Sequence, residues 1–235
     1  MEAQRIFGST ARSDDEHWIS VSDLMAGLMV IFLFVAISYM RDVVNENDRM
    51  ERIAITWNET QDALYEDLQA EFEADLVHWN AVLDRESLAV RFREPDVLFN
   101  SGEANLKPRF MMILAEFFPR YLAVLRSYRD DIDEVRLEGH TSSVWDGARD
   151  PMDGYLKNMR LSQDRTRSVL GFCLQLSSIE SDRSWARDTI TANGLSSSRL
   201  VTDDGGREDE ALSRRVEFRV RTNADREIVR ILRES

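Results

Sequence analysis

The chain has 235 residues and is strongly acidic, with 43 Asp and Glu against 30 Lys and Arg and a formal net charge of −13. This balance argues against nucleic acid as a partner, because phosphate binding needs a basic face. One cysteine and three scattered histidines provide neither a disulfide nor a Cys/His metal cluster, so we expect no metal and no bound cofactor. The sequence also contains no phosphate-binding glycine loop and no GxSxG turn, and we therefore do not expect an enzyme.

An apolar stretch runs from Ile19 to Met40. At about 1.5 Å per residue it can cross a bilayer core of about 30 Å, and Trp18 and Tyr39 lie at its ends, as interface aromatics do. The preceding residues include acids as well as bases and no small-residue cleavage site follows, which favours an uncleaved anchor over a signal peptide. We expect a tail over 1–18 and a transmembrane helix over 19–40. Basic residues on the two sides nearly balance, so charge alone leaves the orientation open.

Asp23 is the one charged residue inside this stretch. Helical spacing places it on a face of mostly small residues: Ser20, Asp23, Ala26, Gly27 and Val30. Small residues allow another helix to approach closely, so the carboxylate would face protein. Two explanations stay open: a carboxylate near the interface that reaches water, or an ion or proton relay, which is the usual role of intramembrane acids.

Residues 41–87 are expected to form a helical connector, with no Pro or Gly in the segment. Its apolar residues recur at spacings of seven, then four and three: Met50, Trp57, Leu64, Leu68, Phe72, Leu76 and Trp79. The pattern fits an amphipathic helix folded against the following domain, and it also fits a self-associating stalk. Both readings stay open.

From Leu88 onward, segments with strand and helix periods alternate. We expect short strands with turns at EPD and NSG, a helix over 111–128 kinked or broken at Pro119, and a strand over 132–139. A loop over 143–155, a helix over 158–178, a strand over 188–194, a loop over 194–212 and a final strand over 214–222 follow. Val216, Phe218 and Val220 should point inward from the last strand. Interleaved strands and helices predict a two-layer α/β domain over 88–222, followed by a tail over 223–235.

Four motifs in this order, VLFNSGEANLKP, VRLEGHTSS, NMRLSQDR and SRRVEF, resemble the OmpA-like peptidoglycan-binding domain. The N-terminal HWISVSDLMAGLMVIFLF resembles the membrane segment of MotB-type stator subunits, in which an aspartate precedes an apolar helix. The whole chain is similar to the MotB-like subunit of Zorya anti-phage systems. The resemblance implies a transmembrane helix and helical connector followed by an OmpA-like two-layer α/β domain.

The resemblance also implies a ligand site. In OmpA-like domains an acid after GHT and the arginine of LSxxR bind the diaminopimelate of the peptide stem, carboxylate to ammonium and guanidinium to carboxylate. Arg165 matches that arginine, Asn158 and Leu161 match the NxxL positions before it, and Thr141 belongs to GHT. Ser142 stands where the family has its aspartate.

Three acids in the following loop are candidates to replace that aspartate: Asp146, Asp150 and Asp153. Otherwise binding is weaker or differently tuned. Arg165 can also be read as a plain surface arginine. Arg214 and Arg215 are adjacent on a strand and face opposite ways, so at most one reaches a given site, and salt bridges explain both. His140 is expected to be a hydrogen-bonded loop histidine.

The function implied by the resemblance is that of a peptidoglycan-anchored subunit of an ion-driven inner-membrane motor acting in anti-phage defence. Asp23 would carry the permeating H⁺ or Na⁺. The expected partners are peptidoglycan, a second copy of the chain in a dimer, and a polytopic MotA-like membrane subunit. The N-terminus would be cytoplasmic and the C-terminal domain periplasmic. A flagellar-type stator subunit and a passive OmpA-like wall anchor, with a structural Asp23, are the alternatives.

Overall fold

The structure is a computed structural model that describes residues 12–93 and 98–223, with the backbone alone for residues 12–20, 47 and 49–58. Its contacts divide the chain into two units, Met1–Ala54 and Ile55–Ser235. The side chains of four residues named above are not among the described ones: Trp18, Ser20, Met50 and Trp57. Their expected positions at the membrane interface, on the face of Asp23 and in the connector therefore stay predictions.

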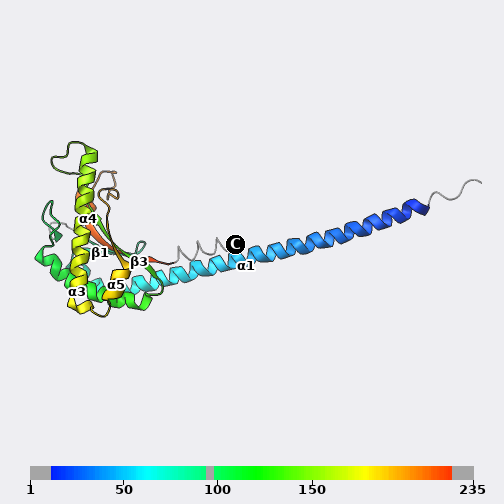
Figure 1. Ribbon diagram of the computed structural model, residues 1–235, viewed down its shortest axis with the longest axis horizontal. Helices are drawn as coiled ribbons and strands as arrows, with labels where there is room; N and C mark the ends of the chain where they lie inside the picture. Colours follow the sequence, from blue (N-terminus) through cyan, green and yellow to red (C-terminus); the bar gives the residue numbers. More distant parts are fainter. Residues whose placement is uncertain (1–11, 94–97, 224–235) are drawn as a thin grey trace, which may run out of the picture. The chain divides into compact units, whose positions relative to one another are not determined.

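Helix α1 spans Arg12–Leu76 (Figure 1). Its segment Val21–Glu46 has a mean hydropathy of 2.2 and is long and apolar enough to cross a membrane, by length and composition. The large apolar side chains of this segment are exposed; Leu24 and Phe34, for example, are 75% and 73% exposed. The expected span over 19–40 therefore lies on a helix throughout, and the apolar segment extends somewhat past its predicted end.

The last turns of α1 belong to the core of the second unit. Leu64, Leu68 and Phe72 are fully buried, and the Phe72 ring lies 5.8 Å from that of Trp79 and 5.1 Å from that of Phe117. For these residues the structure supports the helix folded against its own domain, and not the self-associating stalk. The predicted helical connector is wrong at its end, because α1 stops at Leu76 and residues 81–84 form a strand.

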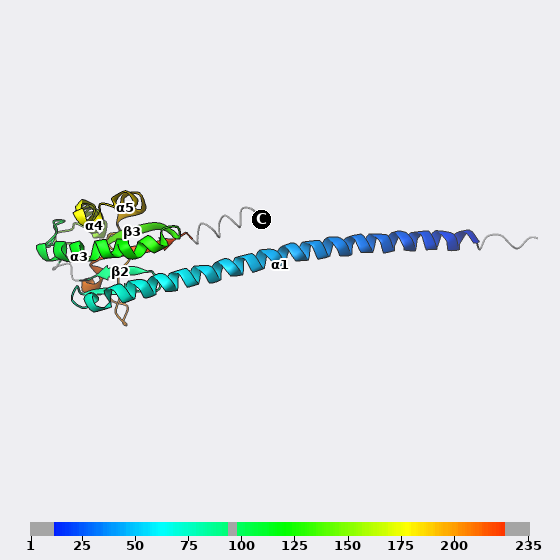
Figure 2. The same cartoon turned by 90° about the horizontal axis from the view of Figure 1, so that it is seen from below.

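Five strands form one sheet in the order β1-β2-β5-β3-β4. They are β1 (Ala81–Asp84), β2 (Ala89–Phe92), β3 (Ile132–His140), β4 (Ile190–Gly194) and β5 (Arg215–Thr222). Only the β3–β4 pair is parallel. The helices of this unit are α3 (Pro108–Leu125), α4 (Pro151–Gln175), α5 (Arg183–Thr189) and α6 (Glu210–Ser213). Two 3-10 turns, η1 (Arg126–Tyr128) and η2 (Ser177–Ile179), complete the described elements. Helices α4 and α5 lie side by side (Figure 2), and the predicted two-layer α/β class is confirmed.

One face of the sheet is apolar and faces the helices. The predicted inward side chains of β5, Val216, Phe218 and Val220, are buried, which confirms that prediction. The ring of Phe117 from α3 lies 5.1 Å from the rings of both Phe92 and Phe218. Burying a side chain of this size contributes roughly 1.5–3 kcal/mol, so this aromatic cluster is a main source of stability.

The other face of the sheet is charged yet partly buried. Glu217 is fully buried and its carboxylate lies 2.6 Å from Arg215, 3.0 Å from Arg219 and 3.1 Å from Arg91. Burial acts to raise the pKa of Glu217, but the hydrogen bond and charge of Arg215 outweigh it and hold that pKa below its usual value. Strand alternation thus separates an apolar face from an ion-pair network.

His140 belongs to this network, and the prediction of a hydrogen-bonded loop histidine is wrong. His140 is the last residue of β3, not a loop residue, and it is buried. Its Nε2 lies 3.6 Å from Glu138, longer than a hydrogen bond, and neither ring nitrogen has a hydrogen-bond partner among the described residues. Burial lowers the pKa of His140 below its usual 6.5.

Two helices differ from the prediction in their extent. Helix α3 spans Pro108–Leu125 instead of 111–128, and of the two expectations at Pro119 the break is wrong, because the helix continues through it with Phe117, Phe118 and Tyr121 fully buried. Helix α4 begins at Pro151, seven residues before the predicted start at 158. Asp150 caps it by accepting a 2.9 Å hydrogen bond from the Asp153 amide, a start that the Asp-Pro pair favours.

Candidate functional site

Two glycines allow α4 to lie directly against the sheet. A Cβ on Gly139 would lie 2.7 Å from Cγ2 of Thr166 and 2.9 Å from the carbonyl oxygen of Ser162. A Cβ on Gly194 would lie 2.3 Å from the backbone nitrogen of Gln163. The glycine of GHT is therefore needed for close packing of α4 on the ends of β3 and β4, where the following loop begins.

The loop after β3 is held by hydrogen bonds from other segments. Asn158 of α4 is buried and its Nδ2 donates to the carbonyls of Ser142 at 3.1 Å and Val144 at 3.3 Å. The backbone nitrogen of Ser143 donates to a carboxylate oxygen of Glu208 at 2.9 Å. The asparagine predicted as a ligand residue thus positions the loop that carries Ser142.

Arg165 is not the exposed surface arginine of the alternative reading. It is only 7% exposed, and its guanidinium lies over the Phe99 ring, 4.8 Å from the centroid. Its Nε donates to the carbonyl of Glu103 at 2.9 Å and its Nη2 to that of Asn100 at 3.2 Å. Arg165 therefore orders the loop at residues 100–103 in addition to any contact with a ligand.

All five predicted ligand residues line one cavity of about 390 Å³: Thr141, Ser142, Asn158, Leu161 and Arg165. The remaining lining residues are Phe99, Asn100, Ser101, Gly102, Val144, Trp145, Asp146, Glu210 and Arg214. The volume lies within the usual range for small-molecule sites, about 300–1,000 Å³. Residues far apart in sequence thus meet at one concave surface.

The charges around this cavity are balanced. Asp146 and Glu210 carry negative charge, and Arg165 and Arg214 carry positive charge. Within the described part of the chain, Oγ1 of Thr141 and Nε of Arg214 are buried without hydrogen-bond partners. Buried polar atoms are usually paired, and these two atoms are able to pair with a polar ligand. Such a lining fits a ligand end that carries both an ammonium and a carboxylate group.

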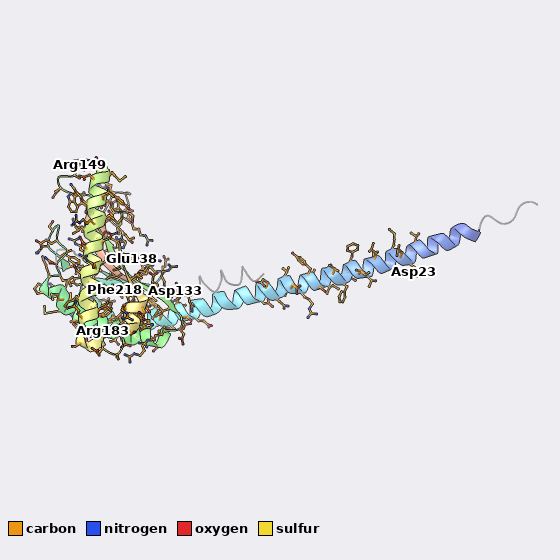
Figure 3. The ribbon with its side chains drawn as sticks, in the orientation of Figure 1. Asp23, Asp133, Glu138, Arg149, Arg183 and Phe218 are labelled. Carbon is orange, nitrogen blue, oxygen red and sulfur yellow. The ribbon has the colours of Figure 1, made fainter. Side chains whose placement is uncertain are left out.

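The structure separates the three acids proposed to replace the family aspartate. Asp146 lines the cavity, whereas Asp150 caps α4. Asp153 accepts a hydrogen bond from the backbone nitrogen of Arg149 and forms an ion pair with Lys157 at 2.9 Å. Figure 3 shows Arg149 at the N-terminal end of α4. Those contacts hold the pKa of Asp153 far below its usual range. Asp146 alone of the three lines the cavity.

The adjacent arginines separate, but not by strand alternation, because β5 begins at Arg215 and Arg214 is the C-cap of α6. Arg215 lies in the charged network of the sheet, 2.6 Å from Glu217, as the salt-bridge interpretation expects. Arg214 instead lines the cavity, and its Nη1 lies 3.7 Å from Glu210, one helical turn earlier. Glu210 was missed by sequence reasoning, because the four-residue helix that carries it is too short to show a period.

A second cluster, Glu138, His140 and Glu217, has the composition of a metal site. One ligand atom from each lies within 4.8 Å of the others. The negative charge of the two carboxylates is already matched by nearby arginines, with Arg215 and Arg219 both on Glu217. A divalent cation would have to displace those ion pairs, so we assign the cluster to structure.

Asp23 lies on α1 within the apolar segment (Figure 3). Its side chain is exposed and makes no ion pair or hydrogen bond with any residue that the structure describes. Ala26, Gly27 and Val30 share its helical face by spacing, and a Cβ on Gly27 would meet no atom within 4 Å. Its role as an ion carrier stays a prediction.

No protein-family model matches the chain. The chain is 46% identical over 221 residues to the Zorya protein ZorB of Escherichia coli strain Crooks, covering 94% of each chain. It is 27% identical over 220 residues to a ZorB of another Escherichia coli strain, covering 91% of this chain and 85% of that one.

Solved structures with a similar fold include a MotB-like protein from Desulfovibrio vulgaris, at 25% identity and a TM-score of 0.49, covering 70% of this chain and 95% of that one. The cell wall anchor of the T6SS from Pseudomonas aeruginosa is similar at 23% identity and a TM-score of 0.46, covering 66% and 96%. The identity to the first ZorB extends over nearly the whole of both sequences. The chain therefore belongs to the ZorB family of Zorya proteins.

Proposed function

We propose that this chain is the wall-anchored subunit of an ion-driven MotA/MotB-like complex of the inner membrane that acts in anti-phage defence. Its C-terminal domain binds peptidoglycan in the periplasm, its N-terminus is cytoplasmic, and Asp23 carries the permeating H⁺ or Na⁺. A polytopic MotA-like subunit and a second copy of the chain complete the complex.

The observation that carries the wall-binding part is the cavity that gathers Thr141, Ser142, Asn158, Leu161 and Arg165. A stem peptide of peptidoglycan ends in groups that carry ammonium and carboxylate charges, and the lining offers two acids and two arginines. Guanidinium–carboxylate pairs are among the stronger hydrogen-bonded contacts in proteins. Since peptidoglycan lies outside the inner membrane, this ligand also sets the proposed orientation.

The ion-carrying part is supported by Asp23, an acid in an apolar segment without a partner in the described chain. A carboxylate at mid-membrane costs about 2.5–3.5 kcal/mol on insertion scales, and less near the interface. One charge moving through 100 mV releases about 2.3 kcal/mol, a comparable amount, so the membrane potential is large enough to change its occupancy. One helix cannot enclose an ion path, which is why a polytopic partner is needed.

The wall-binding part is tested by sedimenting the full chain, in detergent, with purified sacculi. Arg165→Ala should lower binding at least tenfold, since a charge-assisted contact of about 1.5–3 kcal/mol and the order of the loop at 100–103 are lost together. Arg160→Ala is the matched control, because Arg160 lies on the same helix with its side chain 89% exposed. If the Arg165→Ala variant sediments with sacculi as well as the parent does, Arg165 does not contribute to peptidoglycan binding.

The ion-carrying part is tested with Asp23→Asn, which keeps the size of the side chain but cannot ionise. The variant should co-purify with its membrane partner and give no protection against phage. Asp42→Asn, at the far end of the apolar segment, is the control and should protect normally. An assembled Asp23→Asn complex with full protection would leave the chain as a passive wall anchor.

A further inference from the structure

The position that carries the ligand-binding acid in OmpA-like domains is occupied here by Ser142, a neutral residue that lines the cavity and is buried. A ligand end with an ammonium group needs a negative partner, because a buried cation without one is costly. The lining offers two carboxylates for that role, Asp146 and Glu210.

These two acids are held differently. Asp146 lies in the loop between β3 and α4 and makes no hydrogen bond or ion pair with the described residues. Both acids are exposed. Glu210 is the first residue of α6, whose N-cap Asp209 accepts a 3.0 Å hydrogen bond from the Leu212 amide. The backbone that carries Glu210 is thus fixed by local hydrogen bonds, so less backbone entropy is lost when its side chain binds a ligand.

The anchoring of α6 extends to Ser213, its last residue. Ser213 is fully buried and its Oγ accepts a 2.9 Å hydrogen bond from the backbone nitrogen of Val201. Glu210 and Arg214 lie on either side of this anchor and are separated by one turn. Both side chains reach the cavity, so their charges are presented together.

The two side chains lie close together without a hydrogen bond between them. The carboxylate of Glu210 lies 3.7 Å from Arg214 Nη1, beyond hydrogen-bond distance, and Arg214 Nε is buried without a hydrogen-bond partner among the described residues. A carbon that bears both an ammonium and a carboxylate group would place one charge on each side chain. This pairing would also occupy the unpartnered Nε.

We propose that Glu210 binds the ammonium group of the ligand in this cavity, in the role that Ser142 cannot fill, and that Arg214 binds the neighbouring carboxylate. The inference rests on the proposed function, since the ligand is the amine-bearing end of a peptidoglycan stem peptide. It moves the acid of the site from the loop after β3 to the helix before β5.

The test uses the full chain in detergent and two forms of sacculi, one unmodified and one with its stem-peptide amines acetylated. Acetylation removes the positive charge, so the parent protein should bind acetylated sacculi about tenfold more weakly. Glu210→Gln should bind unmodified sacculi about tenfold more weakly and should lose nothing more on acetylation. Ser142→Asp added to Glu210→Gln should restore both the binding and its sensitivity to acetylation.

Two controls keep the outcomes separate. Asp204→Asn changes an exposed acid of the loop that precedes α6 and should behave as the parent. Asp146→Asn should retain sensitivity to acetylation; if this variant loses it and Glu210→Gln keeps it, the ammonium is bound by Asp146 and the proposal is wrong. Parent protein that binds neither form of sacculi would overturn the proposed wall binding itself, and the inference with it.

Discussion

The two parts of helix α1 place similar apolar residues in opposite surroundings. Leu24 and Phe34 in the first part are 75% and 73% exposed, whereas Leu64, Leu68 and Phe72 in the last part are fully buried by the sheet and α3. The last part carries acids on its outer positions, such as Glu59 and Glu73, and the first part carries almost none between Val21 and Met40. The two parts of the helix are thus suited to different surroundings. The last part is buried by protein, and the first part is apolar on all sides, as a lipid-facing helix is.

The largest effect is expected from removing the last part of α1. A fragment starting at Leu88 lacks Leu64, Leu68, Phe72 and Trp79, all members of the core cluster, together with strand β1. Each lost side chain costs about 2–5 kcal/mol, so the four together cost about 8–20 kcal/mol, which is comparable to or larger than the usual stability of a domain, about 5–15 kcal/mol. The fragment 88–235 should therefore be unfolded by circular dichroism, while 55–235 should melt cooperatively. A cooperative transition in the shorter fragment would show that the core is stable without the last part of α1, which contradicts this prediction.

A single charge should sharpen the comparison. Leu68→Glu places an unpaired carboxylate among buried apolar side chains and should lower the free energy of unfolding of fragment 55–235 by about 3–5 kcal/mol. Val77→Glu is the matched control, because Val77 follows the helix and is 83% exposed; its effect should stay within about 0.5 kcal/mol. Urea titration of the two variants measures the difference, and equal midpoints would contradict the buried position of Leu68.

The reverse experiment alters the first part of the helix. Leu33→Arg should lower membrane integration by about 3 kcal/mol on insertion scales, because a cation at the centre of a span is costly. The melting temperature of the second unit, measured in detergent, should not change. Leu33→Ile is the control, and full retention of the Leu33→Arg chain in alkali-washed membranes would argue against a lipid-facing segment.

The smallest effect concerns pH and lies in the second unit alone. Burial holds the pKa of His140 below 6.5, so the unfolded chain binds a proton before the folded one as the pH falls. The free energy of unfolding of fragment 55–235 should then decrease below about pH 6.5, by at most about 1.4 kcal/mol per pH unit.

His140→Gln is the variant that isolates this slope. Glu138, Glu217 and Arg215 all face His140, and the two carboxylates titrate at lower pH, with pKa values below their usual 4.5. The slope between pH 6.5 and 5 should therefore flatten in His140→Gln, while acid unfolding below about pH 4.5 persists. If calorimetry finds the same slope of the free energy of unfolding against pH in His140→Gln, groups other than His140 are responsible for it.

Much of the fold could be predicted from local pattern. Strand β5 shows strict alternation of charged and apolar residues, and both its range and its inward face follow from that. Strand β1 could not be predicted, because four residues after an amphipathic helix are too few to show a change of period. Helix α3 continues through Pro119 because tertiary packing of its neighbours exceeds the local cost, which no local rule contains.

The site divides in the same way. The motifs GHT and LSxxR located one end of the cavity, and the structure brings all five of their predicted residues together. The burial of Arg165 depends on carbonyls more than 60 positions earlier, at Asn100 and Glu103, and is a property of the folded chain alone. Glu210 could not be recognised from local pattern either, since it lines a cavity with residues of α4 and of the loop after β3 that are far away in sequence.

The close contacts of Gly139 and Gly194 with α4 have an evolutionary consequence. They set the approach of α4 to β3 and β4 through backbone packing, independently of which charged side chains line the neighbouring cavity. An acid can thus disappear from one wall and arise on another by single substitutions, with no change in the position of the walls. With Glu210 in the proposed role, the acid of the site has changed position while the scaffold stays the same, and a search for relatives that insists on an acid directly after GHT will overlook chains such as this one.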